Sequence, residues 1–152
     1  MSRPRLRSFV VSGVSMSPAL RDGDRFLGWR PGSSRRFRRG SIVAFIHPAR
    51  PGFWLVKRVV GLSGEVITID TGEVLVNGKS GVDRWGDGWS APDGEWRIPD
   101  GELFVLSDQR PLTRDDSRGF GPIGAANLYR MVFPPRTRRT RPPIPGAIRT
   151  DD

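Results

Sequence analysis

Short apolar runs, separated by turn residues, follow one another along most of the chain. Valine, isoleucine, phenylalanine and tryptophan favour extended backbone, while the glycine, proline, aspartate and asparagine between the runs favour turns. No segment has the sustained 3.6-residue period of a long amphipathic helix. The predicted strands lie in SFVVSGVSM, DRFLGWR, GSIVAFI, FWLVKRVVGL, EVITIDTGEVLVNGK, EWRIP, ELFVLSD and LYRMVF. The pattern therefore predicts a mainly β protein whose coiled antiparallel sheets form a small barrel-like body.

The clearest pairing in the sequence is the hairpin EVITIDTGEVLVNG. Its two apolar segments are joined by the turn TGE. The first strand carries Val66, Ile67 and Ile69. We expect these residues to face Val74 and Val76 of the second strand.

Length and apolar content suit one folded domain. The 152 residues are 36% apolar and include 8 phenylalanines and 5 tryptophans, enough for one modest core. We expect a basic arm over 1–8, the folded domain over 9–133 and a Pro/Arg-rich disordered tail over 134–152.

The sequence also bears on membrane association. No run of about 18 apolar residues is present, so the sequence predicts neither a transmembrane segment nor a signal peptide. On this basis we expect a cytoplasmic or a peripherally membrane-associated protein.

The net charge of +9 is concentrated at the two ends of the chain. Residues 1–40 hold ten arginines against two aspartates, and 136–152 hold five against two, so the segment between them is nearly neutral. This distribution favours solvated arms over a basic groove, and we expect no nucleic-acid partner. A non-catalytic basic β-barrel that binds nucleic acid stays as the alternative function.

The chemistry available to the chain is limited by two residue types. Cysteine is absent, which excludes a disulfide framework, a thiol nucleophile and a thiolate metal site. The single histidine, His47, stands beside a proline turn, a setting more typical of a loop residue than of a ligand or base. A Ser-His-Asp triad would have to use it, so we do not expect one. We also expect no metal and no cofactor.

In VSGVSMSPALRDGD, residues 11–24, a strand-like run ends at a serine. Gly13 permits a bend, and Pro18 keeps Ser17 away from helical geometry. Ser15 is thereby placed at a strand end. This stretch alone favours an ordinary turn residue, because serine is common in turns, and a nucleophile would need a base elsewhere in the chain.

The two lysines stand out because 23 of the 25 basic residues are arginine. Arginine keeps its proton in proteins, whereas a buried lysine can lose it. Lys79 follows Asn-Gly in a turn and is expected to be solvated. Lys57 lies in FWLVKRVVGL, on the opposite face of the strand from Val56 and Arg58. Burial would lower its pKa from about 10.4 to about 7 or 8 and make it a base for Ser15; alternatively, its ammonium group extends from a sheet edge into water.

Five blocks, in this order, resemble the type I signal peptidases, the serine/lysine-dyad endopeptidases: GVSMSPALRDGD, GSIVAF, VKRVVGLSGE, VLVNG and LSDQRPLTRDDSRGFGPI. They cover most of residues 9–125. The resemblance implies a mostly β catalytic domain that cleaves N-terminal signal or leader peptides after small residues, through an acyl-enzyme. The precursor would bind as an added strand. Family members usually carry N-terminal transmembrane helices that this sequence lacks, so we expect an anchorless member with a peripheral membrane contact or a membrane-anchor partner.

Carried over residue by residue, the resemblance makes Ser15 the nucleophile and Lys57 the general base. Gly13 takes the position where some members have a second oxyanion donor, so backbone N–H groups are expected to serve there. Thr113 matches the hydroxyl residue that contacts and orients the lysine. Ser117 is a second candidate, because the motif here has one residue more than usual. The residues expected to shape the cleft or brace the site are Met16, Pro18, Arg58, Asp108, Arg110, Asp116 and Arg118.

Beside the serine we expect a cleft for small apolar side chains, lined by Val14, Phe45 and Val56. Two functions within the same chemistry stay open. One is a general leader peptidase, and the other is a dedicated maturation protease for one cytoplasmic precursor, as in relatives that process nickel superoxide dismutase. Self-cleaving repressors share the dyad, but the sequence has no helix-turn-helix segment.

Overall fold

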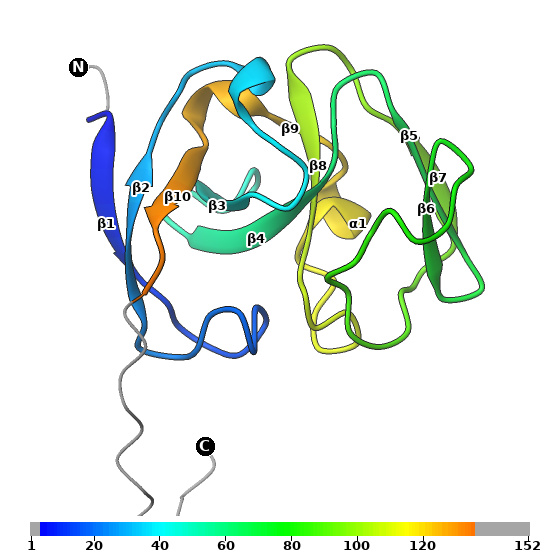
Figure 1. Cartoon of the computed structure of the whole chain (residues 1–152), viewed down its shortest axis with the longest axis horizontal. Helices are drawn as coiled ribbons and strands as arrows, with labels where there is room; N and C mark the ends of the chain where they lie inside the picture. The colour runs from blue at the N-terminus through cyan, green and yellow to red at the C-terminus, as the bar shows by residue number, and fades with distance from the viewer. Residues whose placement is uncertain (1–3, 136–152) are drawn as a thin grey trace, which may run out of the picture.

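Two antiparallel sheets make up the computed structural model, which describes residues 4–135 (Figure 1). The larger sheet has seven strands in the order β1-β2-β10-β3-β4-β8-β9, and the smaller has three in the order β6-β5-β7. The strands are β1 (Leu6–Val10), β2 (Arg25–Trp29), β3 (Ile42–Ile46), β4 (Trp54–Gly61), β5 (Val66–Asp70), β6 (Glu73–Val76), β7 (Gly94–Arg97), β8 (Glu102–Leu106), β9 (Ile123–Gly124) and β10 (Tyr129–Phe133). The helical segments are η1 (Ser34–Arg36), α1 (Ser117–Phe120) and η2 (Ala125–Asn127).

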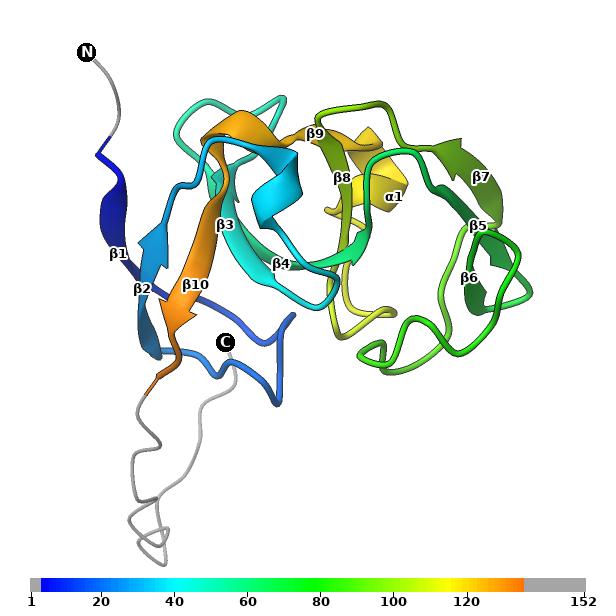
Figure 2. The same ribbon diagram turned by 45° about the horizontal axis from the view of Figure 1, so that its top comes forward.

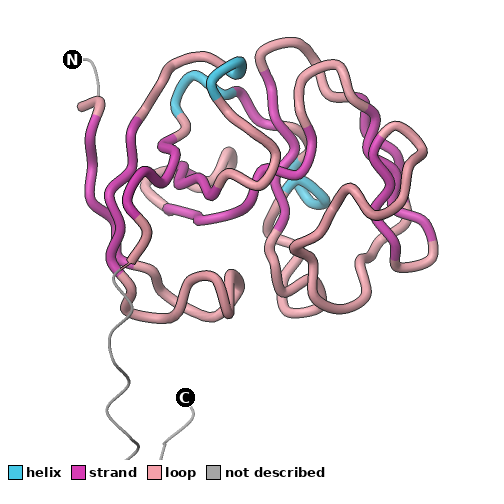
Figure 3. Tube along the Cα trace, viewed as in Figure 1, coloured by secondary structure: helices cyan, strands magenta, loops and turns pink. Residues whose placement is uncertain are grey.

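The prediction of a mainly β fold with coiled antiparallel sheets is confirmed, but the barrel does not close. β1 and β9 are the two ends of the larger sheet, and the described strands include no pairing between them. Figure 2 shows the sheet curving from β1 through β3 and β4 to β8, with the smaller sheet beyond β8. The long loops that connect the strands are evident in Figure 3.

The hairpin β5–β6 has nearly the predicted register. Ile67 pairs with Val76 and Ile69 with Val74, and all four side chains are buried. Val66, predicted on the same face, is only half-buried, because neighbouring residues of a strand point to opposite faces. The turn follows Asp70, at Thr71 and Gly72, with φ of 48° and 82°, values that match a type I′ turn.

Over residues 4–135, the core consists of three clusters of buried apolar side chains. One lies on the face of the larger sheet that carries Phe45 and Val59, and a second lies on the opposite face around Phe9. The third joins the two sheets, since residues of β4 and β8 pack there against the β5–β6 hairpin. The smaller sheet is thus attached to the larger one by a shared apolar contact.

The sequence analysis made predictions for both ends of the chain, and only the N-terminal one can be compared with the structure, because the described residues end at Pro135. β1 begins at Leu6, so residues 6–8, expected in the basic arm, belong to the sheet. The predicted disordered tail lies, except for Pro134 and Pro135, outside the described residues. Over residues 4–135 no helix has the length and apolar character needed to cross a bilayer.

Candidate active site

Ser15 lies in the loop between β1 and β2, residues 11–24, which we call the serine loop. Its ends are held together by hydrogen bonds from the Val11 N–H to the Asp24 carbonyl and from the Gly23 N–H to the Val11 carbonyl, both 2.8 Å. Met16 and Leu20 anchor the loop, since both side chains are buried in the cluster around Phe9. Pro18, predicted to shape the cleft, is exposed.

Ser15 itself is half-buried, and the backbone around it has free donors. The N–H groups of Ser15 and Met16 have no acceptor among the described residues. The N–H of Gly13, by contrast, donates to Asp22 Oδ1 at 2.8 Å. Gly13, predicted at the oxyanion position, has a φ of 90° and serves the turn of the loop, so its N–H is already occupied.

Lys57 is buried in the middle of β4, with 3% of its surface exposed. Its Nζ donates a hydrogen bond to Ser107 Oγ at 2.9 Å. Burial lowers the pKa of Lys57, because the charged form loses its hydration, while the carboxylates of Asp116, Asp115 and Asp108 act in the opposite direction. Of the two alternatives that the sequence left open for Lys57, the buried amine is confirmed and the solvated ammonium is wrong.

The hydroxyl in contact with the lysine is not one of the two predicted. Thr113 Oγ1 accepts the N–H of Asp115 at 3.0 Å, and Ser117 Oγ accepts the N–H of Val105 at 2.9 Å. Both hydroxyls therefore stabilise backbone near α1 and β8. The contact with Lys57 comes from Ser107, which the sequence reasoning missed.

Strand register explains why Ser107 reaches the lysine. β4 and β8 are antiparallel, and Arg58 is paired with Leu106. One further step along this register sets Lys57 opposite Ser107, just past the end of β8. Side chains at opposite positions of an antiparallel pair lie on the same face, close together. The only sequence signal is a serine directly after the apolar run ELFVL.

Three buried ion pairs surround this position and contain all the charged residues predicted to brace the site. Arg58 holds Asp108 through two hydrogen bonds, Nε to Oδ1 at 2.8 Å and a terminal nitrogen to Oδ2 at 2.7 Å. The other two pairs are Arg118 with Asp116 at 2.8 Å and Arg110 with Asp83 at 2.7 Å. Charges this deeply buried are tolerated because each is paired and hydrogen-bonded.

The segment 107–109 connects the lysine to the serine loop. Two residues beyond Ser107, the N–H of Gln109 donates to the Ser15 carbonyl at 2.9 Å. The side-chain amide of Gln109 also donates to the Ser17 carbonyl at 2.7 Å. No direct hydrogen bond joins Ser15 to Lys57 among the described residues, so the connection between them runs through this segment.

The expected cleft of Val14, Phe45 and Val56 is not a single feature. Phe45 is paired with Leu55 and belongs to one face of the sheet, whereas Val56 is paired with Ala44 and packs on the other face. Because strand side chains alternate between faces, these residues cannot line the same cleft. Val14 is exposed on the serine loop.

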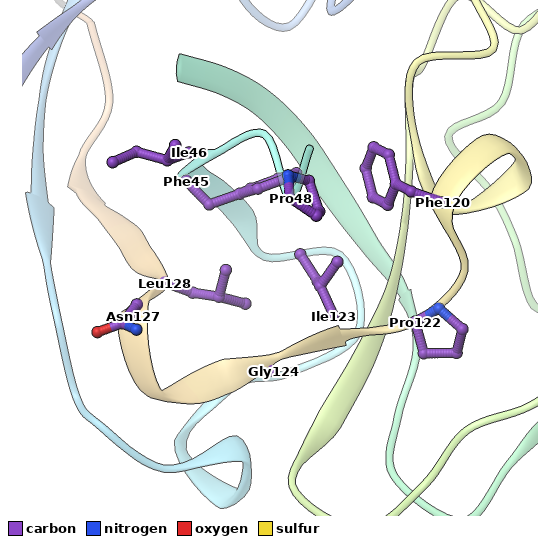
Figure 4. Close-up of a pocket in the computed structure, with 9 residues that line it drawn as sticks. All are labelled: Phe45, Ile46, Pro48, Phe120, Pro122, Ile123, Gly124, Asn127 and Leu128. Atoms are coloured by element: carbon purple, nitrogen blue, oxygen red, sulfur yellow. The ribbon is translucent and has the colours of Figure 1, made fainter. Parts of the chain in front are cut away.

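Phe45 instead lines a cavity of about 420 Å³ between β3, α1 and β9 (Figure 4). The other residues that line it are Ile46, Pro48, Phe120, Pro122, Ile123, Gly124, Asn127 and Leu128. Neither Ser15 nor Lys57 is among them. This cavity is therefore separate from the candidate active site.

Comparisons with known proteins give the family of this chain. The family model described as "Signal peptidase, peptidase S26" matches residues 5–133. Signal peptidase I V of Bacillus subtilis is 34% identical over 82% of this chain and 82% of its own length. Signal peptidase I of Bacillus caldolyticus is 35% identical over 75% of this chain and 70% of its own length. The crystal structure of a signal peptidase I from Enterococcus faecalis is 27% identical, with a TM-score of 0.55 over 64% of this chain and 97% of that chain.

These matches establish the class of protein as a serine endopeptidase. The chain belongs to the signal peptidase family, peptidase S26.

Proposed function

We propose that this protein cleaves signal or leader peptides from precursor proteins after small residues, with Ser15 as nucleophile and Lys57 as general base. The observation that carries the proposal is the buried amine of Lys57, whose pKa is lowered by burial. Its hydrogen-bond partner Ser107 lies two residues from Gln109, whose N–H donates to the Ser15 carbonyl. A lysine in that environment can be neutral near physiological pH, and a neutral amine can accept a proton.

The reaction then follows the order of a serine acyl-transfer. Lys57 takes the proton of the Ser15 hydroxyl as its oxygen attacks the scissile carbonyl, and the resulting ammonium gives that proton to the leaving amine. An ester between Ser15 and the signal peptide remains. Lys57, neutral again, takes a proton from water as the water oxygen attacks the ester carbonyl. The ammonium then returns that proton to the Ser15 oxygen as it leaves, which frees the carboxyl product and restores the neutral amine.

The oxyanion of the tetrahedral intermediates requires donors near Ser15. The unpaired N–H groups of Ser15 and Met16 support this role. In other acyl-transfer enzymes one such donor contributes about 3 to 4 kcal/mol to transition-state stabilisation. The two N–H groups belong to the backbone of a loop that is anchored by the buried side chains of Met16 and Leu20, so they need little reorganisation during the reaction.

Cleavage of a synthetic precursor peptide with alanine before the scissile bond tests this function. We expect Ser15→Ala to abolish turnover, and Lys57→Arg to do the same, because arginine keeps the positive charge but cannot act as a base. Lys79→Arg is the matched control and should leave the rate unchanged, since Lys79 is exposed. Retained cleavage in Lys57→Arg would refute the dyad.

A general leader peptidase and a dedicated maturation protease would differ in how many precursors they cleave. N-terminal mapping of proteins that accumulate uncleaved when Ser15 is replaced separates the two. Many secreted precursors would support the general enzyme, and a single precursor would support the dedicated one.

We also propose a peripheral membrane contact, through the face of the larger sheet that carries Trp29. On this face Leu6 lies beside Trp29, and Trp29 lies beside Arg130. Leu6, Val10 and Phe133 expose 56%, 57% and 65% of their surface. Apolar side chains exposed next to cationic ones are typical of surfaces that enter the headgroup region of an anionic bilayer.

The cationic part of this surface is a hollow of about 320 Å³ lined by arginines around Trp29. Arg36 and Arg130 lie over the Trp29 ring, 5.9 and 5.4 Å from its centre. Arg35 and Arg38 complete the lining. No carboxylate of residues 4–135 forms a salt bridge with any of the four arginines, so their charge is available for lipid phosphates.

A further inference from the structure

Ser107 occupies the position in this molecule from which the general base can be oriented. Its side chain and that of Lys57 are both buried, with 0% and 3% of the residue surface exposed. The bond between Nζ and Oγ, at 2.9 Å, has the length of an ordinary hydrogen bond. No other hydrogen-bond partner of the Lys57 amine is found in the described part of the chain.

The backbone of Ser107 is fixed on both sides by buried charges. Its N–H donates to Asp116 Oδ2 at 3.0 Å, and its carbonyl accepts Arg110 Nε at 2.6 Å. Asp116 is in turn paired with Arg118, which also donates to the Arg110 carbonyl at 3.0 Å. With the main chain held in this way, the hydroxyl of Ser107 can move little relative to β4.

Thr113 is held away from this role by its own loop. Its hydroxyl accepts the N–H of Asp115. Asp115 Oδ1 lies 2.7 Å from His47 Nε2, and His47 Nδ1 accepts the N–H of Ala49 at 3.0 Å, so the ring presents a proton on Nε2 to the carboxylate. The segment between Arg110 and Asp116 is thus anchored towards His47 at the residue where the motif is one position longer than usual.

We propose that Ser107, rather than Thr113, is the positioning residue of the general base, an inference that rests on the proposed function of Lys57. A neutral amine has two N–H groups and one lone pair. When one N–H is donated to Ser107 Oγ, rotation about the Cε–Nζ bond is restricted and the lone pair can be directed to the Ser15 hydroxyl. The ammonium formed during the reaction keeps the same hydrogen bond, so Ser107 orients the lysine side chain in both protonation states. Ser107 takes no part in the proton transfer.

Matched removal of the two hydroxyls tests the assignment. In Ser107→Ala we expect kcat for the precursor peptide to fall about 10- to 100-fold, the size of effect that misplacement of a catalytic group produces, with KM within about twofold. Thr113→Val, which removes a hydroxyl at nearly constant shape, should reduce kcat less than about threefold. Folding of both variants is checked by their thermal unfolding curves.

A second readout does not depend on turnover. Protein labelled with ¹³C at lysine Cε gives signals from only two lysines, which Lys79→Arg assigns. We expect Ser107→Ala to shift the Lys57 signal and leave Lys79 unchanged, and Thr113→Val to leave both unchanged. An unchanged Lys57 signal in Ser107→Ala, or a larger kcat loss in Thr113→Val than in Ser107→Ala, would overturn the assignment.

The two proposals can fail separately. If the wild-type protein cleaves no precursor peptide while the Lys57 signal responds to Ser107→Ala, the proposed function fails and the contact stands. If the wild-type protein cleaves and Ser107→Ala cleaves equally well, the positioning role fails and the Ser15/Lys57 dyad stands.

Discussion

A single buried amine determines the chemistry available at the candidate site. Lys57 is enclosed by the larger sheet and approached by carboxylates, yet desolvation is the dominant influence on its pKa. In the unfolded chain the same amine would have a pKa of about 10.4. The folded protein therefore binds fewer protons than the unfolded chain between the lowered pKa of Lys57 and about 10.4.

This difference predicts a pH dependence of stability. The free energy of unfolding should rise with pH across that window, because the unfolded state holds the extra proton there. The contribution of Lys57 is fully present above about pH 10.4 and is lost as the pH falls through the folded-state pKa. Lys57→Met cannot be protonated, so its stability relative to wild type should be highest at low pH and decrease towards pH 10.4.

Urea unfolding of wild type and Lys57→Met at a series of pH values measures this difference. The exposed Lys79→Met serves as control, and its difference from wild type should not vary across the window. A pH-independent difference for Lys57→Met would contradict the lowered pKa.

At the scale of elements, the site depends on the junction between β4 and the end of β8. Arg58 of β4 and Asp108, just beyond β8, form a two-point ion pair whose side chains expose 9% and 5% of their surface. Arg58 also donates a hydrogen bond to the Gly40 carbonyl, which connects the loop before β3 to β4. The pair lies next to Lys57 and Ser107 in sequence, so it holds the two strands in the register that brings those residues together.

We expect Asp108→Ala to lower the free energy of unfolding by about 3 to 5 kcal/mol, because it leaves the Arg58 charge buried without its partner. The double variant Arg58→Met/Asp108→Leu should lose less than the sum of its two single variants, since neither charge remains. Chemical denaturation of wild type, Arg58→Met, Asp108→Leu and the double variant gives the coupling energy. The exposed Asp100→Ala is the control and should change stability by less than about 0.5 kcal/mol. Additive losses would show that the pair does not couple β4 to the segment after β8.

At the scale of the whole molecule, the serine loop and the proposed membrane surface share the strands β1 and β2. The serine loop joins Val10 of β1 to Arg25 of β2, whereas the arginine hollow lies at the other end of these strands, around Trp29, and is formed by Arg130 of β10 together with arginines of η1 and the residues after it. Val10 and Phe133 pair with Arg25 and Leu27 of β2, so contact of these two side chains with a bilayer would bring the serine-loop end of the strands towards the membrane.

Vesicle sedimentation tests this arrangement. The full chain should bind vesicles containing phosphatidylglycerol more strongly than pure phosphatidylcholine, and added salt should weaken binding because it screens the arginines. Replacing Leu6, Val10 and Phe133 by serine should reduce binding several-fold. Serine at Trp89 and Leu112, also exposed apolar residues, is the matched control and should have little effect. Salt-sensitive RNA binding without vesicle binding would instead support the nucleic-acid alternative.

The strand pattern was readable from the sequence because each strand has its own apolar signal. Seven of the nine longer strands lie within the predicted runs, and β1 and β7 begin two residues and one residue before theirs, whereas the two-residue β9 and the one-turn α1 were not predicted. Such short elements have too few residues for a period and depend on tertiary contacts, such as the bond from Val105 N–H to Ser117 Oγ. The failure of the barrel to close also has no local signal, because it depends on the distance between the two end strands.

The mainly β class, the family resemblance and the choice of Lys57 as the candidate base could all be read from the sequence, because apolar runs, motif blocks and an isolated lysine are local features. Whether that lysine is buried, and which hydroxyl contacts it, became evident only from the fold. The register between β4 and β8 sets Ser107 opposite Lys57, and an additional residue anchored to His47 holds Thr113 elsewhere. Contacts between strands distant in the sequence depend on register and loop path, which no local pattern of residues specifies.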